Sequence, residues 1–158
     1  MRKAAFWLGA VAAPIGLGAA IYVLWRPTRL RVFSWLAQLG LGDAVLQARA
    51  SAAGLGERLP GWVLYTLPDA LWAMALSAAM ARIWRETLRA RGAWIWLAMG
   101  ALIGAGGEGL QWLGWLPGTA DWADALASLA GAGLGLWLGS RSSSEEPDSK
   151  APTSALPL

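Results

Sequence analysis

Charged residues in this sequence fall in short bands, and the stretches between the bands are long and apolar. The first such stretch, Ala4–Trp25, is bounded by Arg2 and Lys3 before it and by Arg26 after it. As a helix it would be about 33 Å long, which is enough to cross a hydrocarbon core of about 30 Å. Only 15% of all residues are charged, compared with roughly 25% in soluble domains. The pattern predicts an all-α integral membrane protein.

Further stretches of the same kind place four transmembrane helices in one membrane domain. We expect the domain at residues 1–139, its spans at 4–25, 61–84, 93–115 and 121–139, and a polar, disordered tail at 140–158. Pro14 is expected to kink the first span and Pro68 the second. The alternative for the second span is a short irregular segment before a helix from Leu67. The alternative for the first span is a cleaved signal peptide.

The segment between the first two spans has a different pattern. Apolar residues recur at helical spacing from Val32 to Leu46, whereas Asp43 interrupts any spanning run. We therefore predict an amphipathic helix, Val32–Arg49, that lies at the membrane interface. A short fifth crossing is the alternative, and the acid and two nearby glycines disfavour it.

The basic bands also predict the orientation. Four spans put both termini on one side, and the dense arginine band Arg82–Arg91 is expected to stay cytoplasmic. Both termini are then cytoplasmic, and Arg26–Arg58 lies outside. Because the basic residues flank apolar spans and form no single basic face, no nucleic-acid partner is expected.

The chain contains no Cys and no His. This excludes disulfide bonds, thiol chemistry, zinc sites built from these residues and catalytic triads that depend on His. We predict no cofactor.

Four acids lie in the predicted outer halves of the spans, where an ionised group costs at least a few kcal/mol. They are Asp69, Glu108, Asp121 and Asp124. Asp69 and Glu108 would lie about 12 Å and about 10 Å from the outer ends of their helices, at a similar level. These halves contain no Lys or Arg, so a counter-ion would have to come from Arg26–Arg58.

Each acid also has a purely structural interpretation. Asp121 follows a Pro-Gly turn and is a candidate N-cap, with Asp124 as its capping-box partner. Asp69 is a candidate helix-start residue beside Pro68. Glu108 lies in mid-span and has no capping role, which leaves a structural hydrogen bond to a neighbour.

The last two predicted spans carry seams of small and polar residues. One seam comprises Gly100, Gly104, Gly107, Glu108 and Gln111, and the other comprises Asp121, Asp124, Ser128, Gly131 and Gly135. Gly100 with Gly104, and Gly131 with Gly135, form small-xxx-small pairs that allow helix backbones to approach closely. We therefore expect the two seams to face each other, with the acids at the outer mouth.

These same residues carry a resemblance. The stretches Gly107–Gln111 and Gly118–Asp124, followed by Ser128, Gly131 and Gly135, resemble the VanZ-like family. The last helical hairpin of that family carries a Glu-xx-Gln, Asp-xx-Asp, Gly-xxx-Gly signature. The stretch Leu67–Trp72 resembles a Pro-Asp-x-Leu-Trp segment of its short members.

The resemblance covers about half of the chain and implies a bacterial inner-membrane protein with a role in the cell envelope. The member that gives the family its name is associated with resistance to the glycopeptide teicoplanin. Two departures are Thr119, where many members have Arg, and Ser128, where they have Asn. No catalytic mechanism comes with the resemblance, so Glu108, Gln111 and the two aspartates are carried over as signature residues only.

Four functions fit the sequence. The first is binding of a lipid-linked or cell-wall component at the acidic outer mouth. The second is a membrane-embedded enzyme that uses the carboxylates as acid and base, or as ligands of Mg²⁺ or Mn²⁺. The third is a proton- or cation-coupled transporter with Glu108 as its titrating group. The fourth is a structural or regulatory partner of a larger membrane protein complex.

Overall fold

The computed structural model describes residues 2–84, 92–116 and 120–141, and these residues form helices and short connections with no strand. The elements in chain order are α1 (Arg2–Phe6), the π-helical segment η1 (Trp7–Ala12), α2 (Ala13–Trp25), α3 (Arg31–Gln38), α4 (Gly42–Gly56), α5 (Gly61–Tyr65), α6 (Leu67–Ile83), α7 (Ala93–Trp112) and α8 (Trp122–Arg141). The predicted all-α class is confirmed. Most of the Arg82–Arg91 band and of the predicted tail lies outside the described residues.

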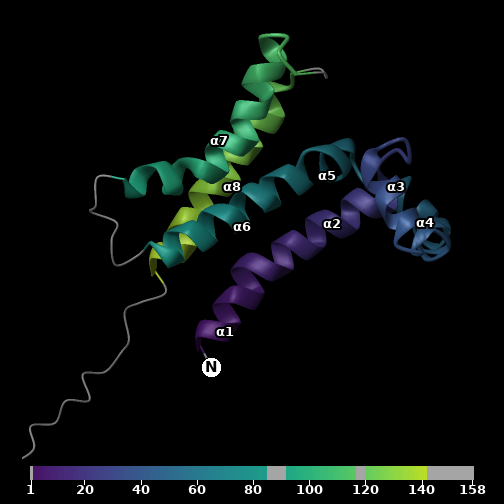
Figure 1. Cartoon of the computed structure of the whole chain (residues 1–158), viewed down its shortest axis with the longest axis horizontal. Coiled ribbons are helices and arrows are strands. Elements are labelled where there is room, and N and C mark those ends of the chain that lie inside the picture. The colour runs from purple at the N-terminus through teal and green to yellow at the C-terminus, as the bar shows by residue number, and fades with distance from the viewer. Residues whose placement is uncertain (1, 85–91, 117–119, 142–158) are drawn as a thin grey trace, which may run out of the picture.

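Helix α6 is the centre of the arrangement. It packs against α8, α7 and α2, and Figure 1 shows it between α2 on one side and the α7–α8 pair on the other. Apart from Pro68 in its first turn, its buried side chains are those of alanine and serine: Ala73, Ala75, Ser77, Ala78 and Ala81. The core is therefore built from close backbone approach and not from interlocking large side chains, as is typical of helix packing in membranes.

Two of the described helical stretches are long and apolar enough to cross a membrane. They are Lys3–Trp25, with a mean hydropathy of 1.8, and Ala93–Trp112, with a mean hydropathy of 1.2. Only 22% and 11% of their most apolar windows are buried inside the protein. The core helix of a soluble protein would be mostly buried, so these exposed apolar faces favour contact with lipid.

The first long helix changes its winding before Pro14. The backbone N–H of Ala13 donates to the carbonyl of Leu8, five residues back, at the end of η1. Proline has no N–H to donate to the carbonyl one turn earlier, and a local π adjustment is one way in which membrane helices accommodate it. The expected kink at Pro14 thus coincides with a π-helical segment directly before it.

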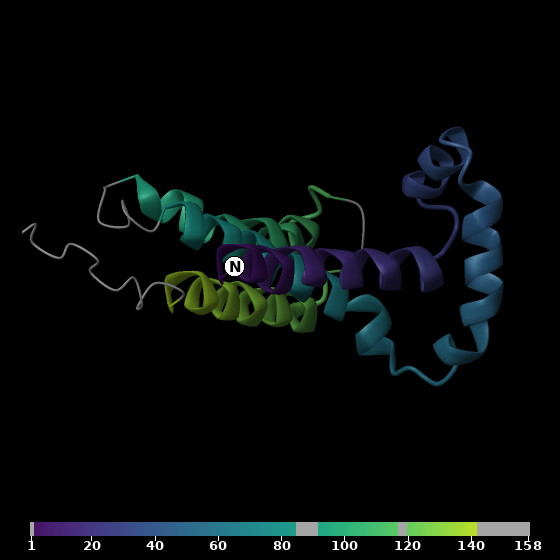
Figure 2. The same ribbon diagram turned by 90° about the horizontal axis from the view of Figure 1, so that it is seen from below.

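The single interfacial helix expected at Val32–Arg49 is wrong, because the chain forms two helices, α3 and α4. The break lies at Gly40, which has φ +75°. The N–H of Gly40 donates to Ala37 and that of Leu41 to Leu36, the paired bonds that close a helix on a left-handed glycine. Figure 2 shows α4 running across the end of α2, nearly perpendicular to it.

The second predicted span is also divided. We expected one helix kinked at Pro68, whereas α5 ends at Tyr65 and α6 begins at Leu67, with Thr66 between them. Pro68 cannot donate to the carbonyl of Leu64, so the first helix does not continue through it. The alternative, a short irregular segment before a helix from Leu67, describes the chain better. The segment is, however, the short helix α5 and not irregular.

The two small-residue seams meet each other only in part. A Cβ on Gly104 would lie 2.6 Å from the Cβ of Ser128, so α7 and α8 touch there. A Cβ on Gly131 or on Gly135 would instead collide with backbone carbonyls of α6, those of Ala70 and Met74. The expected facing of Gly131 and Gly135 toward α7 is wrong, because the central helix α6 takes up the closest approach to α8.

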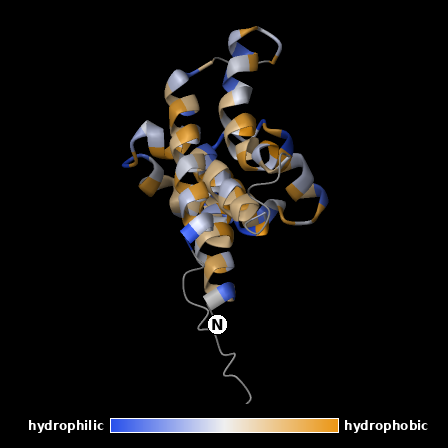
Figure 3. Cartoon of the chain, turned by 90° about the vertical axis from the view of Figure 1, so that its left-hand side faces the viewer, coloured by the Kyte–Doolittle hydropathy of each residue, from blue (hydrophilic) through white to orange (hydrophobic). Residues whose placement is uncertain are grey.

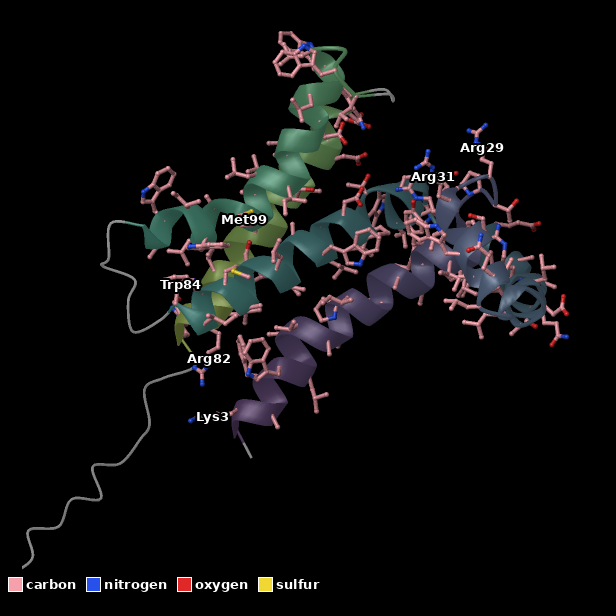
Figure 4. All side chains as sticks on the ribbon, viewed as in Figure 1. Lys3, Arg29, Arg31, Arg82, Trp84 and Met99 are labelled. Carbon is pink, nitrogen blue, oxygen red and sulfur yellow. The ribbon has the colours of Figure 1, made fainter. Side chains whose placement is uncertain are left out.

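Charged residues gather at opposite ends of this helix group. Figure 4 shows Lys3 and Arg82 at the end that carries the N-terminus, and Arg29 and Arg31 at the end that carries α3 and α4. Figure 3 shows the apolar residues distributed along the helices between these ends. The separation of the charges matches the bands seen in the sequence.

Candidate functional site: an acidic cleft between three helices

A cleft of about 260 Å³ opens between α6, α7 and α8. Its polar lining consists of Asp69 from α6, Glu108 from α7, and Asp124 and Ser128 from α8. Four residues singled out from the sequence therefore lie around one space, although they are spread over three helices.

Small residues allow the acids to converge. Gly104 and Gly107 lie on the α7 face that lines the cleft, four residues and one residue before Glu108, respectively. Gly104 is in contact with Ser128, and the Cβ of Ala73 would be 3.7 Å from a Cβ at Gly104. A larger side chain at Gly104 would push α7 away from α8, whereas Gly107 has nothing within 4 Å, so a side chain there would extend into open space.

Glu108 has a partner that the sequence did not suggest. Its Oε2 accepts a hydrogen bond of 2.8 Å from the backbone N–H of Asp121, the residue before α8 begins. Carboxylates are favourable at a helix N-terminus, where backbone N–H groups lack partners within the helix. The expectation that Glu108 has no capping role is therefore wrong, because it helps to cap a neighbouring helix.

Asp121 caps the same helix from within the chain. Its Oδ1 accepts a hydrogen bond of 2.8 Å from the N–H of Ala123, which confirms the N-cap interpretation. Asp121 does not line the cleft, and neither does Gln111. These two signature residues are thus separated from the ones that face the open space.

Arg26, at the end of α2, supplies positive charge to the site. Its Nη2 lies 3.9 Å from Oδ2 of Asp69 and donates a 2.9 Å hydrogen bond to the carbonyl of Tyr65. The guanidinium also lies over the rings of Tyr22 and Tyr65, at 5.4 and 5.0 Å. The counter-ion comes from the Arg26–Arg58 segment, as the sequence required.

The other two acids of the cleft have no such cation. Among the described residues no Lys or Arg forms an ion pair with Glu108 or Asp124, and Oδ1 of Asp124 is buried without a hydrogen-bond partner. No group of three or more acids among the described residues is close enough to hold a metal ion. The cleft therefore offers separate carboxylates that suit an ammonium group or neutral hydrogen-bond donors.

Trp72 lines the cleft as well, a role that the sequence did not predict for it. It lies one turn after Asp69 and lines the cleft. Its Nε1 lies 3.4 Å from the carbonyl of Ile15, and its ring packs on Tyr22 at 5.6 Å. The spacing of Asp69 and Trp72 on one helical face was the available signal.

Comparisons with protein-family models, with curated proteins and with solved structures give no match to this chain. The site is therefore interpreted from its own chemistry.

Proposed function

We propose that the chain is a four-span inner-membrane protein of the VanZ-like type. In this proposal, its acidic cleft binds a lipid-linked or cell-wall component of the bacterial envelope at the outer surface. The observation that carries the proposal is the convergence of Asp69, Glu108 and Asp124, from three helices, on one cleft.

The distribution of side-chain size supports the membrane part of the proposal. The buried positions are mostly Ala, Gly and Ser, whereas large apolar side chains are exposed; Trp112 is 80% exposed and Ile103 is 63% exposed. Soluble monomers rarely expose extended apolar surface, and a bilayer would cover it.

The lengths of the remaining helices support four crossings. Helix α8 has 20 residues and α6 has 17, which correspond to about 30 Å and about 26 Å. Helix α5 adds a further turn before α6. Both lengths suit a hydrocarbon core of about 30 Å, with α5 completing the shorter helix.

The position of the cleft supports an outer-surface ligand. The start of α6, the end of α7 and the start of α8 meet around the cleft, and Arg26 lies there beside Asp69. Figure 4 shows Lys3 and Arg82 toward the opposite end, where the N-terminus lies. With cytoplasmic termini, the end with the cleft faces away from the cytoplasm. Carboxylates there are accessible to envelope components.

The proposal is tested in a deletion strain that is complemented with variants and exposed to a panel of envelope stresses and antibiotics, teicoplanin included. We expect Asp124→Asn and Glu108→Gln to lose complementation while the protein accumulates in the membrane at normal levels. Asp43→Asn, which changes an exposed acid on α4, is the matched control and should complement fully. Full complementation by both cleft variants would refute the binding role of the cleft.

A further inference from the structure

A second cavity lies beside the acidic cleft. It is an apolar groove of about 350 Å³ between the N-terminal helix and α6, lined by Val11, Ile15, Trp72, Ala75, Leu76 and Ala79. The groove contains no charged side chain. Trp72 lines both the cleft and the groove, so its side chain borders both spaces.

The two cavities follow each other along α6. Asp69 and Trp72 line the cleft, and Trp72, Leu76 and Ala79 line the groove. The distance along the helix from Asp69 to Ala79 is about 15 Å. The polar part lies toward the end of the bundle and the apolar part toward its middle, which is the orientation of a lipid in the leaflet on that side.

The polar part is set up for a positive charge. Asp69 forms an ion pair with Arg26, but no Lys or Arg among the described residues forms one with Glu108 or Asp124. Oδ1 of Asp124 is buried and has no hydrogen-bond donor. A buried acceptor without a donor is costly, and an ammonium group in the cleft would remove that cost.

A second polar group without a hydrogen-bond partner, the hydroxyl of Ser77, lies next to the cleft-lining residue Gly100. Ser77 is 0% exposed, and its hydroxyl has no hydrogen-bond partner. The hydroxyl points at Gly100, which lines the cleft, because a Cβ at Gly100 would collide with it. Ser77 itself does not line the cleft, so its hydroxyl marks the close contact of α6 with α7 and not a contact with the ligand.

Trp72 joins the two parts. Its contacts with Ile15 and Tyr22 fix the ring between α2 and α6. An indole attracts an ammonium group to its face and packs well against alkyl chains. One side chain can thus contact both the head and the chain of an amphiphile.

Because the cleft and the groove adjoin at Trp72, we infer that together they bind a lipid whose headgroup carries an ammonium group. The ammonium would lie among Glu108 and Asp124, and an acyl chain along Trp72, Leu76 and Ala79. The inference rests on the proposed function, since it names the chemical class of ligand for the same cleft. It adds the groove as the second half of the site.

The test measures the thermal unfolding of the delipidated full-length protein in detergent with added lipids. The probes are phosphatidylethanolamine, phosphatidylglycerol with the same acyl chains, and soluble phosphoethanolamine. We expect phosphatidylethanolamine to raise the Tm by several degrees more than phosphatidylglycerol does. The soluble headgroup should need at least a tenfold higher concentration for any shift, because it lacks the acyl chain.

Variants assign the effect to the two halves of the site. Asp124→Asn should reduce the phosphatidylethanolamine shift to that of phosphatidylglycerol, and Asp43→Asn should leave it unchanged. Ala79→Phe fills the groove and should reduce the shift, whereas Ala130→Phe, at an exposed position of α8, should not. Native mass spectrometry of the same samples counts bound lipids, so a variant that merely melts at a lower temperature is still informative.

Equal shifts from the two phospholipids, or a preference that persists in Asp124→Asn, would overturn the ammonium-lipid inference. That result would leave the proposed function standing if Asp124→Asn still failed to complement the deletion strain. Complementation by both Asp124→Asn and Glu108→Gln, together with a lipid preference that persists in Asp124→Asn, would overturn both.

Discussion

Arg26 connects the elements at the end of the bundle where Asp69 lies. It follows the last residue of α2, donates to a backbone carbonyl at the end of α5 and lies near Asp69 in the first turn of α6. Two neighbours, Trp25 and Arg49, add hydrogen bonds between α2 and α4: Trp25 donates to Ala52 and Arg49 to Val23. The carbonyl contact and the two aromatic rings hold the guanidinium more firmly than the carboxylate does.

We expect Arg26→Ala to lower the free energy of unfolding by about 2 kcal/mol, from the lost charged hydrogen bond and cation–π contacts. Its coupling to Asp69→Asn in a double-mutant cycle should stay below about 1 kcal/mol, because the pair is 3.9 Å apart and its side chains are 22% and 37% exposed. Denaturation in detergent micelles measures both, with Arg29→Ala, at an exposed position, as a near-neutral control. A coupling above about 2 kcal/mol would mean that the ion pair, not the carbonyl contact, holds Arg26.

Glu108 combines two roles that different substitutions separate. Glu108→Gln keeps an oxygen that can accept from the N–H of Asp121, so it should cost less than about 1 kcal/mol of stability. Glu108→Ala removes the acceptor and should cost about 1 kcal/mol more than Glu108→Gln. Both should lose complementation if the charge serves the ligand. Asp121→Asn, which still caps α8, should retain complementation. If Glu108→Gln complemented and Asp121→Asn did not, the function would depend on Asp121 and not on Glu108.

At the scale of the elements, glycines decide how the helices pack. Gly131, Gly135 and Gly139 lie on one face of α8, and a Cβ at each would meet backbone atoms of α6. Gly133 lies on the opposite side of the same helix and has nothing within 4 Å. The glycine face thus permits α8 to approach the central helix, and the intervening glycine has no such role.

Gly131→Ala should therefore destabilise the protein by about 1–3 kcal/mol, because its methyl group would overlap the Ala70 carbonyl, which belongs to a helix backbone and cannot rotate away. Gly133→Ala should be neutral or stabilising by up to about 1 kcal/mol, since alanine favours a helix. Melting temperatures of the two purified variants measure the difference. Equal values would show that α8 does not pack on α6 through this face.

The sequence predicted the helices better than their partners. Long apolar runs bounded by charge located the helical stretches, and the seams of small residues predicted that α7 lies next to α8. A helical repeat defines which residues share a face but not which helix that face meets, so the preference of Gly131 for α6 could not be derived. The bond from Asp121 to Glu108 also depends on how α7 and α8 align. Gly40 was noticed only as a break in a span, although its closing of α3 was readable from its position after a helical run.

At the scale of the whole molecule, side-chain size is distributed in the opposite way to a soluble protein. The interior consists of small residues, and the outside carries large ones such as Leu102, which is 57% exposed, and Trp122, which is 76% exposed. Close packing of small residues stabilises helices in a medium that is itself apolar, where burial of large side chains gains little. The exposed apolar side chains of α7, one of the two stretches apolar enough to cross a membrane, are those that a bilayer would cover under the proposed function.

The absence of Cys from the chain allows a direct test of the bilayer and of the orientation together. Single cysteines at Gly54, Ser140 and Leu102 can be labelled with a membrane-impermeant maleimide in intact and in permeabilised cells, since each position is exposed on the protein. We expect Gly54→Cys, on α4, to react in intact cells, and Ser140→Cys, at the end of α8, to react only after permeabilisation. Leu102→Cys should react in neither, because a lipid-facing thiol is shielded from water and stays largely protonated, and it should react once detergent and denaturant are added. Labelling of Ser140→Cys in intact cells would show that the orientation is the opposite one. Rapid labelling of Leu102→Cys without denaturant would show that a bilayer does not surround α7.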